Sequence, residues 1–196
     1  MVLLDEKYWS ERYKSGLIGW DIGYPSLPLV QYLDQIENKS ISLLIPGAGN
    51  AYEADYAFRN GFSNVHVLDI SKEPLERFRL RFPDFPKENL HHQNFFNFSN
   101  TYDLILEQTF FCALDPSLRE EYSQKMLQLL NPGGMLAGVL FDRIFDSEGP
   151  PFGGSREEYL TYFTGKFEIK TFEQCYNSIP ERAGYELFIQ LKKSET

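Results

Sequence analysis

Cysteine and histidine are scarce in this chain of 196 residues, which contains two cysteines and three histidines. Cys112 and Cys175 lie far apart, neither belongs to a Cys-x-x-Cys pair, and the histidines show no metal-binding spacing. We therefore predict two reduced thiols, no disulfide framework and no metal site. His91 and His92 are adjacent, and neighbouring residues on a strand point to opposite faces, so they are not expected to share a metal ion.

Basic residues are in the minority, because 19 Lys and Arg against 28 Asp and Glu give a formal net charge of −9 at pH 7. Nucleic acids and anionic membrane surfaces require a basic face, so this charge argues against both kinds of partner. No apolar run approaches the roughly 18 residues of a membrane-spanning helix, and the charged N-terminus lacks the apolar stretch of a signal peptide. We expect a cytoplasmic monomer that acts on a small molecule.

Internal repeats, low-complexity tracts and linkers are also missing, so residues 1–196 are expected to form a single domain. Aromatic residues, in contrast, reach 16% of the chain. Several of them stand near the N-terminus or in segments that resemble loops, namely Tyr8, Trp9, Tyr13, Trp20, Phe95, Phe96, Phe110 and Phe111. An aromatic-lined pocket is one use for such rings.

Short apolar runs alternate with helical patterns from residue 41 to residue 141. Strands are expected at residues 41–46, 65–70, 90–95, 102–108, 135–141, 167–173 and 186–193. Helices are expected at residues 3–14, 29–36, 51–62, 72–82, 117–130 and 156–164. Gly61 is a predicted C-cap, Ser71 a predicted N-cap, and the NPGG segment at 131–134 separates a helix from a strand. The alternation predicts an α/β fold with a parallel sheet, and the last two strands predict an antiparallel hairpin at one edge.

The PGAGN segment follows the first apolar strand and brings Gly47 and Gly49 to its carboxyl end, where open α/β sheets bind ligands. Asp69 lies 22 positions after Gly47, at the end of the next strand, where a carboxylate can accept two hydrogen bonds from a ribose diol. The dinucleotide fingerprint G-x-G-x-x-G has Tyr52 in its third glycine position here, which disfavours a pyrophosphate. S-adenosylmethionine has a ribose but no phosphate, so it fits this pattern better.

Seven segments together resemble the thiopurine S-methyltransferase family, and most closely its branch of plant halide and thiol methyltransferases. They are YWSERYKSGLIGWDIGYPS, LLIPGAGNAYEADY, VLDIS, YDLILEQTFFCALDP, LNPGG, PPFGGSREEY and YNSIPERAG. The resemblance implies a Rossmann-like class I methyltransferase fold, with a seven-stranded, mostly parallel sheet, an antiparallel edge strand and helices on both faces. It also implies S-adenosylmethionine as the methyl donor, S-adenosylhomocysteine as the product, and an N-terminal segment, residues 1–28, that covers the cofactor.

The resemblance further implies the roles of individual residues. Residues that match cofactor-binding positions are Trp9, Tyr13, Trp20, Gly47, Gly49, Asp69, Asn94, Phe95 and Glu107. Gln108 and Arg182 match positions beside the methyl group and the acceptor. Gln108 replaces an arginine of the mammalian thiopurine enzyme, and Tyr13 replaces a tryptophan of the plant enzymes.

These departures favour small thiols or inorganic anions as acceptors over thiopurines. We expect methyl transfer to a soft nucleophile, such as a thiol, hydrosulfide, a halide or thiocyanate, with Arg182 attracting an anionic one and no dedicated general base. Two alternatives stay open from the residues. They are an NAD(P)-dependent reductase on a similar sheet and a non-catalytic protein that binds S-adenosylmethionine.

Overall fold

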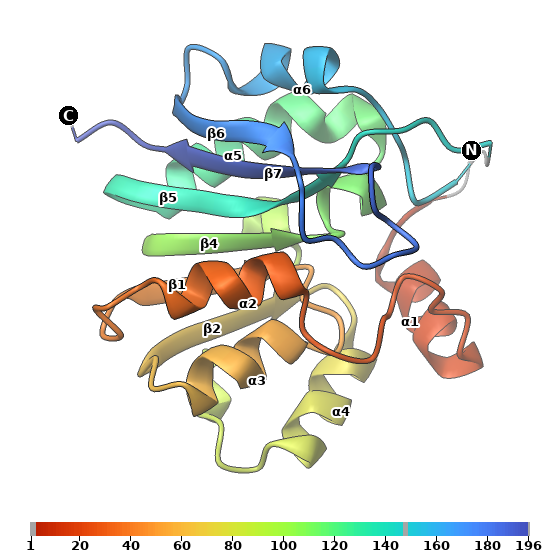
Figure 1. Cartoon of the computed structure of the whole chain (residues 1–196). Coiled ribbons are helices and arrows are strands. Elements are labelled where there is room, and N and C mark those ends of the chain that lie inside the picture. The colour runs from red at the N-terminus through yellow and green to blue at the C-terminus, as the bar shows by residue number, and fades with distance from the viewer. Residues whose placement is uncertain (1–2, 147–148, 196) are drawn as a thin grey trace.

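One sheet of seven strands runs through the molecule, in the order β3-β2-β1-β4-β5-β7-β6, and helices cover both faces (Figure 1). The structure, a computed structural model, describes residues 3–146 and 149–195. The strands are β1 (Ser42–Pro46), β2 (Asn64–Asp69), β3 (Leu90–His92), β4 (Tyr102–Gln108), β5 (Leu130–Phe141), β6 (Glu168–Gln174) and β7 (Glu186–Lys192). The helices of more than one turn are α1 (Glu6–Ser15), α2 (Leu27–Asp34), α3 (Tyr52–Arg59), α4 (Lys72–Arg81), α5 (Arg119–Leu129) and α6 (Arg156–Phe163). The predicted α/β fold is confirmed.

The central strands are apolar throughout because the sheet is covered on both sides. Leu43 and Ile45 of β1 join a core with side chains of α2, α3 and α4, whereas Leu44 between them joins a core with α5 and α6. β4 alternates in the same way, with Leu104 and Ile105 on opposite faces. The period of two along each strand therefore supplies one apolar residue to each core in turn.

The last strand in the sequence is the antiparallel one, as the resemblance implied. β7 pairs antiparallel with β5 on one side and with β6 on the other, so β6 and β7 form the expected antiparallel pair at this edge of the sheet. The strands β1 to β5 pair in parallel with one another. Because β1, β2 and β4 are parallel and adjacent, their carboxyl ends lie along one edge, and the switch of strand order falls between β1 and β4.

The NPGG segment belongs to β5, so the prediction that it only separates α5 from the strand was wrong. β5 begins at Leu130, opposite Tyr102, and the register then shifts so that Met135 lies opposite Leu104. Gly134 accepts a hydrogen bond from the Lys193 backbone, which holds the irregular segment against the chain after β7. The bulge depends on this distant partner, which local turn chemistry does not reveal.

Two other local predictions need correction. β3 ends at His92 and not at residue 95, because Asn94 starts a short 3₁₀ turn with its side chain accepting a hydrogen bond from the Phe96 N–H. Ser71 stands at the N-cap of α4 but makes no capping bond, because its hydroxyl bonds the Glu73 carboxylate instead. Gly61, in contrast, takes the left-handed conformation expected just beyond the end of α3, with a φ of 90°.

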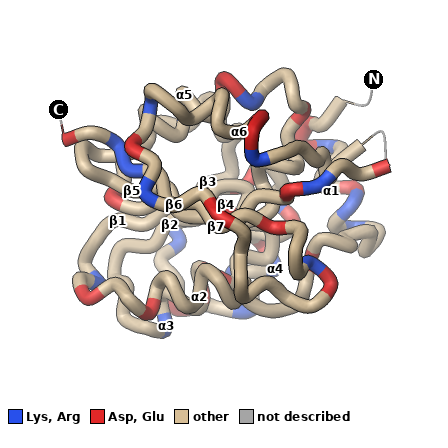
Figure 2. The backbone as a smooth tube through the Cα atoms, turned by 45° about the horizontal axis from the view of Figure 1, so that its top comes forward, with Lys and Arg blue, Asp and Glu red and all other residues tan. Residues whose placement is uncertain are grey.

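Acidic and basic residues are interspersed around the outside of the fold (Figure 2). Among the residues that the structure describes, no helix is both long enough and apolar enough to cross a membrane. The segment before α2 differs from the rest, because none of residues 3–26 belongs to either apolar core. Its position therefore depends on other contacts, which lie at the carboxyl edge of the sheet.

Candidate active site

A cavity of about 410 Å³ opens at the carboxyl ends of the parallel strands. Its walls come from the N-terminal segment, from the glycine loop after β1, from the ends of β2 and β4, and from the turn after β3. The volume lies in the usual range of small-molecule sites. Nine of the eleven residues predicted as a site line it, namely Trp9, Tyr13, Trp20, Gly47, Gly49, Asp69, Asn94, Phe95 and Gln108.

The glycine loop requires glycine at both positions. Gly47 and Gly49 have φ values of 58° and 53°, in the left-handed region that disfavours other residues. A Cβ atom on Gly47 would lie 2.2 Å from Cδ2 of Phe110, and one on Gly49 would lie 2.8 Å from the Tyr13 hydroxyl. A side chain at either position would therefore displace an aromatic residue that lines the cavity.

Replacing Gly47 by alanine is expected to weaken cofactor binding about tenfold. The added methyl group would displace the Phe110 ring, which lines the cavity, and would add roughly 1–2 kcal/mol of left-handed strain. Isothermal titration with S-adenosylhomocysteine measures the change. Gly61→Ala is the matched control, because Gly61 is also left-handed but has open space around it, so it should bind the ligand normally. Equal affinities for the Gly47 variant and the wild type would contradict the close approach.

Asp69 ends β2 with its carboxylate held by the backbone. Oδ2 accepts the N–H of Gly49 at 2.9 Å, and Oδ1 accepts the N–H of Ser71 at 2.8 Å. Burial raises the pKa of Asp69 to about 6, although these two hydrogen bonds oppose the rise. Each carboxylate oxygen retains a further lone pair. The side chain is therefore fixed in orientation and can still accept hydrogen bonds from a diol in the cavity.

Aromatic rings form the cover of the cavity. Trp20 packs edge-to-face on Trp9, with ring centroids 5.6 Å apart, and on Tyr13, with centroids 5.8 Å apart. Phe95 and Phe110 form a second edge-to-face pair at 5.1 Å. Such rings exclude water and attract a nearby cation through their π faces.

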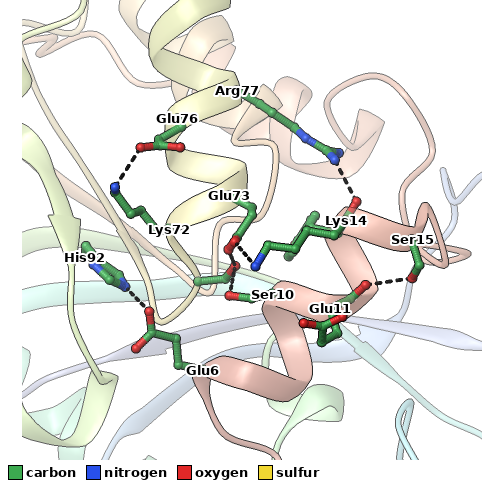
Figure 3. Close-up of polar contacts among 12 residues, drawn as sticks. Glu6, Ser10, Glu11, Lys14, Ser15, Lys72, Glu73, Glu76, Arg77 and His92 are labelled. Carbon is green, nitrogen blue, oxygen red and sulfur yellow. Dashed lines mark hydrogen bonds and ion pairs between the residues drawn. The ribbon is translucent and has the colours of Figure 1, made fainter.

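Polar contacts hold α1 in place beside α4 and β3 (Figure 3). Lys14 pairs with Glu73 at 2.9 Å, and Glu6 pairs with His92 at 2.9 Å. The Arg77 guanidinium donates to the backbone carbonyl of Tyr13 at 2.6 Å. Exposed contacts of this kind contribute little stability each, so their main effect is to place α1 beside the cavity.

The charged residues of the cavity wall are all acidic. They are Asp21, Glu53, Asp69 and Asp115, and no Lys, Arg or His is among the described residues of the lining. A pyrophosphate would meet uncompensated carboxylates there, whereas a sulfonium cofactor would meet attractive charge. Together with the glycine loop, which has no side chains at Gly47 and Gly49, and with Asp69, which can accept bonds from a diol, this lining fits S-adenosylmethionine and disfavours NAD(P).

Gln108 and Thr109 lie at the end of β4, in the wall of the cavity. The Oε1 atom of Gln108 is buried and has no hydrogen-bond partner in the described part of the chain. Thr109 has a φ of 55°, which is rare for a β-branched residue and costs strain. An unsatisfied acceptor beside a strained residue is typical of a ligand-binding position.

Glu107 is not among the residues that line the cavity, so its predicted contact with the cofactor stays a prediction. The side chain is fully buried on the other side of β4, where Oε1 accepts the N–H groups of Phe110 and Phe111 at 2.8 and 2.9 Å. Oε2 accepts the hydroxyl of Tyr122. Burial raises the pKa of Glu107 to about 7. Glu107 thus positions the loop whose outer face lines the cavity.

Arg182 is also absent from the cavity wall, and its predicted role as an attractor of anions stays a prediction. Its guanidinium donates to the Trp20 carbonyl at 2.8 Å, pairs with Glu186 at 3.5 Å and lies over the Phe141 ring. These contacts hold the backbone of the aromatic cover. Arg182 is therefore a positioning residue in this structure. Burial raises the pKa values of Glu53 and Cys112, and the Arg182 charge opposes both rises.

Asn94 lines the cavity, but its carbonyl oxygen already accepts the Phe96 N–H at 2.8 Å. Its predicted contact with adenine therefore depends on the second lone pair of that oxygen. The sequence prediction missed Asp21 and Asn50, which both line the cavity. Asp21 could have been predicted, because it is an acidic residue in the Gly- and Pro-rich segment after α1.

A sequence profile described as thiopurine S-methyltransferase (TPMT) matches residues 4–187. The chain belongs to the thiopurine S-methyltransferase family. As a member of this family it is an S-adenosylmethionine-dependent methyltransferase, so the reductase and the non-catalytic alternative are both set aside.

Proteins similar to this chain include plant enzymes. Probable thiol methyltransferase 2 of Arabidopsis thaliana is 32% identical over 197 residues, covering 96% of this chain and 85% of the relative. Thiocyanate methyltransferase 1 of Brassica oleracea is 28% identical, covering 97% and 86%. A solved N1-methyltransferase of 1,6-didemethyltoxoflavin from Burkholderia thailandensis superposes with a TM-score of 0.76 at 16% identity, covering 96% of this chain and 87% of that one. This likeness confirms the class I methyltransferase fold.

Proposed function

We propose that this member of the family transfers the methyl group of S-adenosylmethionine to the sulfur atom of a small thiol. The observation that carries the proposal is the acidic and aromatic cavity, which contains the unsatisfied oxygen of Gln108. The printed names of the plant relatives, which refer to thiol and thiocyanate, support a sulfur acceptor. When bound, the cofactor would supply a methyl group on a positively charged sulfur. The acceptor thiol, after losing its proton to water, would attack the methyl carbon in line, and S-adenosylhomocysteine would leave as the bond to the sulfonium sulfur breaks.

The residues of the cavity position the reactants and exclude water. Trp9 and Trp20 cover the cavity, and the aromatic faces favour the positive charge that a sulfonium carries. Gln108 offers an acceptor toward which an S–H or N–H group of the acceptor can point. Holding a thiol at about 3–3.5 Å from the methyl carbon can supply several kcal/mol of the rate enhancement.

Cys112 lines the cavity but is not a methyl acceptor in this proposal. Burial raises the pKa of its thiol, and the nearby Glu107 raises it further, so the thiol stays protonated at neutral pH. A protonated thiol is a poor nucleophile. It presents a soft, apolar surface to an acceptor sulfur instead.

Thiols are favoured here over inorganic anions. The charged residues of the cavity wall are all acidic, and Arg182 pairs with Glu186 and is not part of that wall. A thiol can enter the cavity in its neutral S–H form and lose its proton before it reacts, whereas iodide and thiocyanate always carry a negative charge that the acidic wall repels.

The proposed cytoplasmic location and monomeric state rest on the acidic composition and on the two free cysteines.

Turnover with different acceptors tests the proposal. S-adenosylhomocysteine is measured after incubation with S-adenosylmethionine and one of thiophenol, 6-mercaptopurine, hydrosulfide, thiocyanate or iodide, with an acceptor-free reaction as the control. We expect thiophenol to give at least tenfold higher kcat/KM than iodide or thiocyanate. Turnover on none of the five, with the cofactor still bound, would reject a small sulfur acceptor.

A further inference from the structure

Asp21 lies in the loop between α1 and α2, and its carboxylate is held against the start of α3. Oδ1 accepts the N–H of Gly23 at 2.7 Å, while Oδ2 accepts the side-chain amide of Asn50 and lies 3.5 Å from the Tyr52 hydroxyl. Asn50 directly follows Gly49, whose N–H bonds Asp69. The glycine loop is therefore flanked by two carboxylates, bonded to consecutive residues.

The negative charge of Asp21 has no counter-ion in the described part of the chain, because Asp21 takes part in none of its ion pairs. Asp21 instead lies near another carboxyl group, that of Glu53. Burial is the main cause that raises the pKa of Glu53, and the negative charge of Asp21 raises it further. Arg182 acts on Glu53 from outside the cavity lining, but within the cavity the two acidic groups repel each other. A cation bound in the cavity would relieve this repulsion.

An unsatisfied acceptor lies beside Asp21. The Oδ1 atom of Asn50 is buried and has no hydrogen-bond partner among the described residues, although the Nδ2 atom of the same side chain donates to Asp21. An amide oxygen and a carboxylate at one point of a cavity wall can together accept the N–H groups of an ammonium ion. This chemistry differs from that of Asp69, whose two oxygens are fixed by backbone N–H groups.

The other acidic residues of the wall are less suited to an ammonium ion. Asp69 is the acceptor for the ribose, and Oδ1 of Asp115 is used by the backbone and hydroxyl of Ser117. Glu53 accepts the Ser26 N–H at 2.9 Å, and burial favours its neutral form. Asp21 is the half-buried carboxylate that remains.

We propose that Asp21, with the amide oxygen of Asn50 beside it, binds the α-ammonium group of the methionine part of S-adenosylmethionine. The inference rests on the cofactor that the proposed function uses, and it does not depend on which acceptor is methylated. Asp21, the acidic residue of the GWDIG segment, would then contact the amino-acid end of the cofactor, away from the adenine.

Three ligands separate this role from a structural one. S-adenosylhomocysteine carries the ammonium group, its deaminated analogue keeps only the carboxylate, and 5′-methylthioadenosine lacks the amino-acid part altogether. Isothermal titration with each ligand is carried out on the wild type and on Asp21→Asn. Asp34→Asn is the matched control, because it removes the same charge from the exposed end of α2.

We expect Asp21→Asn to weaken S-adenosylhomocysteine about tenfold or more, and to leave the other two ligands within about twofold of the wild type. Asp34→Asn should change none of the three affinities. A similar loss for all three ligands would show that Asp21 only holds the loop, and an unchanged affinity for S-adenosylhomocysteine would place the ammonium group elsewhere. Either result would overturn the assignment while the acceptor assay still decided the proposed function.

Discussion

Replacing Glu107 by alanine is expected to lower the free energy of unfolding by about 3–5 kcal/mol. The carboxylate accepts hydrogen bonds from the backbone N–H groups of Phe110 and Phe111 and from the hydroxyl of Tyr122, and all of these donors would lose their partner. Each buried donor left unsatisfied costs roughly 1–3 kcal/mol. Since an ordinary domain has only about 5–15 kcal/mol of net stability, a large part of it would be lost.

Denaturant unfolding followed by circular dichroism measures this loss, and Glu107→Gln is the matched variant. The glutamine oxygen can still accept both backbone N–H groups, and its amide can donate to Tyr122, so a loss of about 1 kcal/mol is expected. The glutamine variant should also keep its affinity for S-adenosylhomocysteine, because Glu107 only supports the loop behind the cavity. An alanine variant within 1 kcal/mol of the wild type would show that water or a shifted side chain satisfies the three donors.

The opposite roles of Glu107 and Gln108 follow from the geometry of a strand. Neighbouring side chains point to opposite faces, so only one of the two can face the cavity. The sequence shows that both residues end β4, but not which of them points inward. Tyr122 of α5 decides the orientation, and that partner is recognisable only once the helix is packed on the sheet.

Residues whose role depends on backbone position were predictable. Gly47, Gly49 and Asp69 follow apolar strands that are buried on both faces, and parallel strands bring their carboxyl ends to one edge. Arg182 was not predictable in this way, because its partners Trp20 and Glu186 come from different parts of the chain. Long side chains are placed by such tertiary partners, whereas glycines are placed by the local fold.

Replacing Asp69 by alanine is expected to weaken the binding of S-adenosylhomocysteine about a hundredfold. Two hydrogen bonds from a ribose diol to a charged acceptor are worth roughly 1.5–3 kcal/mol each, and part of this is recovered from water. Asp69→Asn keeps one acceptor oxygen in place and should lose about tenfold. Isothermal titration at pH 7.5 measures both, and affinities within twofold of the wild type would remove Asp69 from the ribose.

The pH dependence of S-adenosylhomocysteine binding is expected to show that the ionised carboxylate of Asp69 takes part in binding. Burial raises the pKa of Asp69 to about 6, so the wild type should bind S-adenosylhomocysteine more weakly as the pH falls from 7 to 5. Binding near pH 6 should release protons, because a diol favours the ionised form. Asp69→Asn should show no such dependence in this range. A parallel decline in both proteins would assign the titration to another group.

Unfolding stability measures whether the Asp69 carboxylate is costly to bury in the folded protein. The pKa of Asp69 is higher in the folded protein, about 6, than its ordinary value of 3.8, so the folded state favours the protonated form. The stability that this preference contributes is complete below pH 3.8 and is lost as the pH rises through 6. Asp69→Asn is permanently neutral, so at pH 7.5 its unfolding free energy should exceed that of the wild type, by at most about 3 kcal/mol. The amide of asparagine can accept only one of the two N–H groups that bond Asp69, so a lower stability would show that these bonds outweigh the cost of burying the charge. Weaker binding together with higher stability is thus the combination expected of a buried charge that is retained for its ligand.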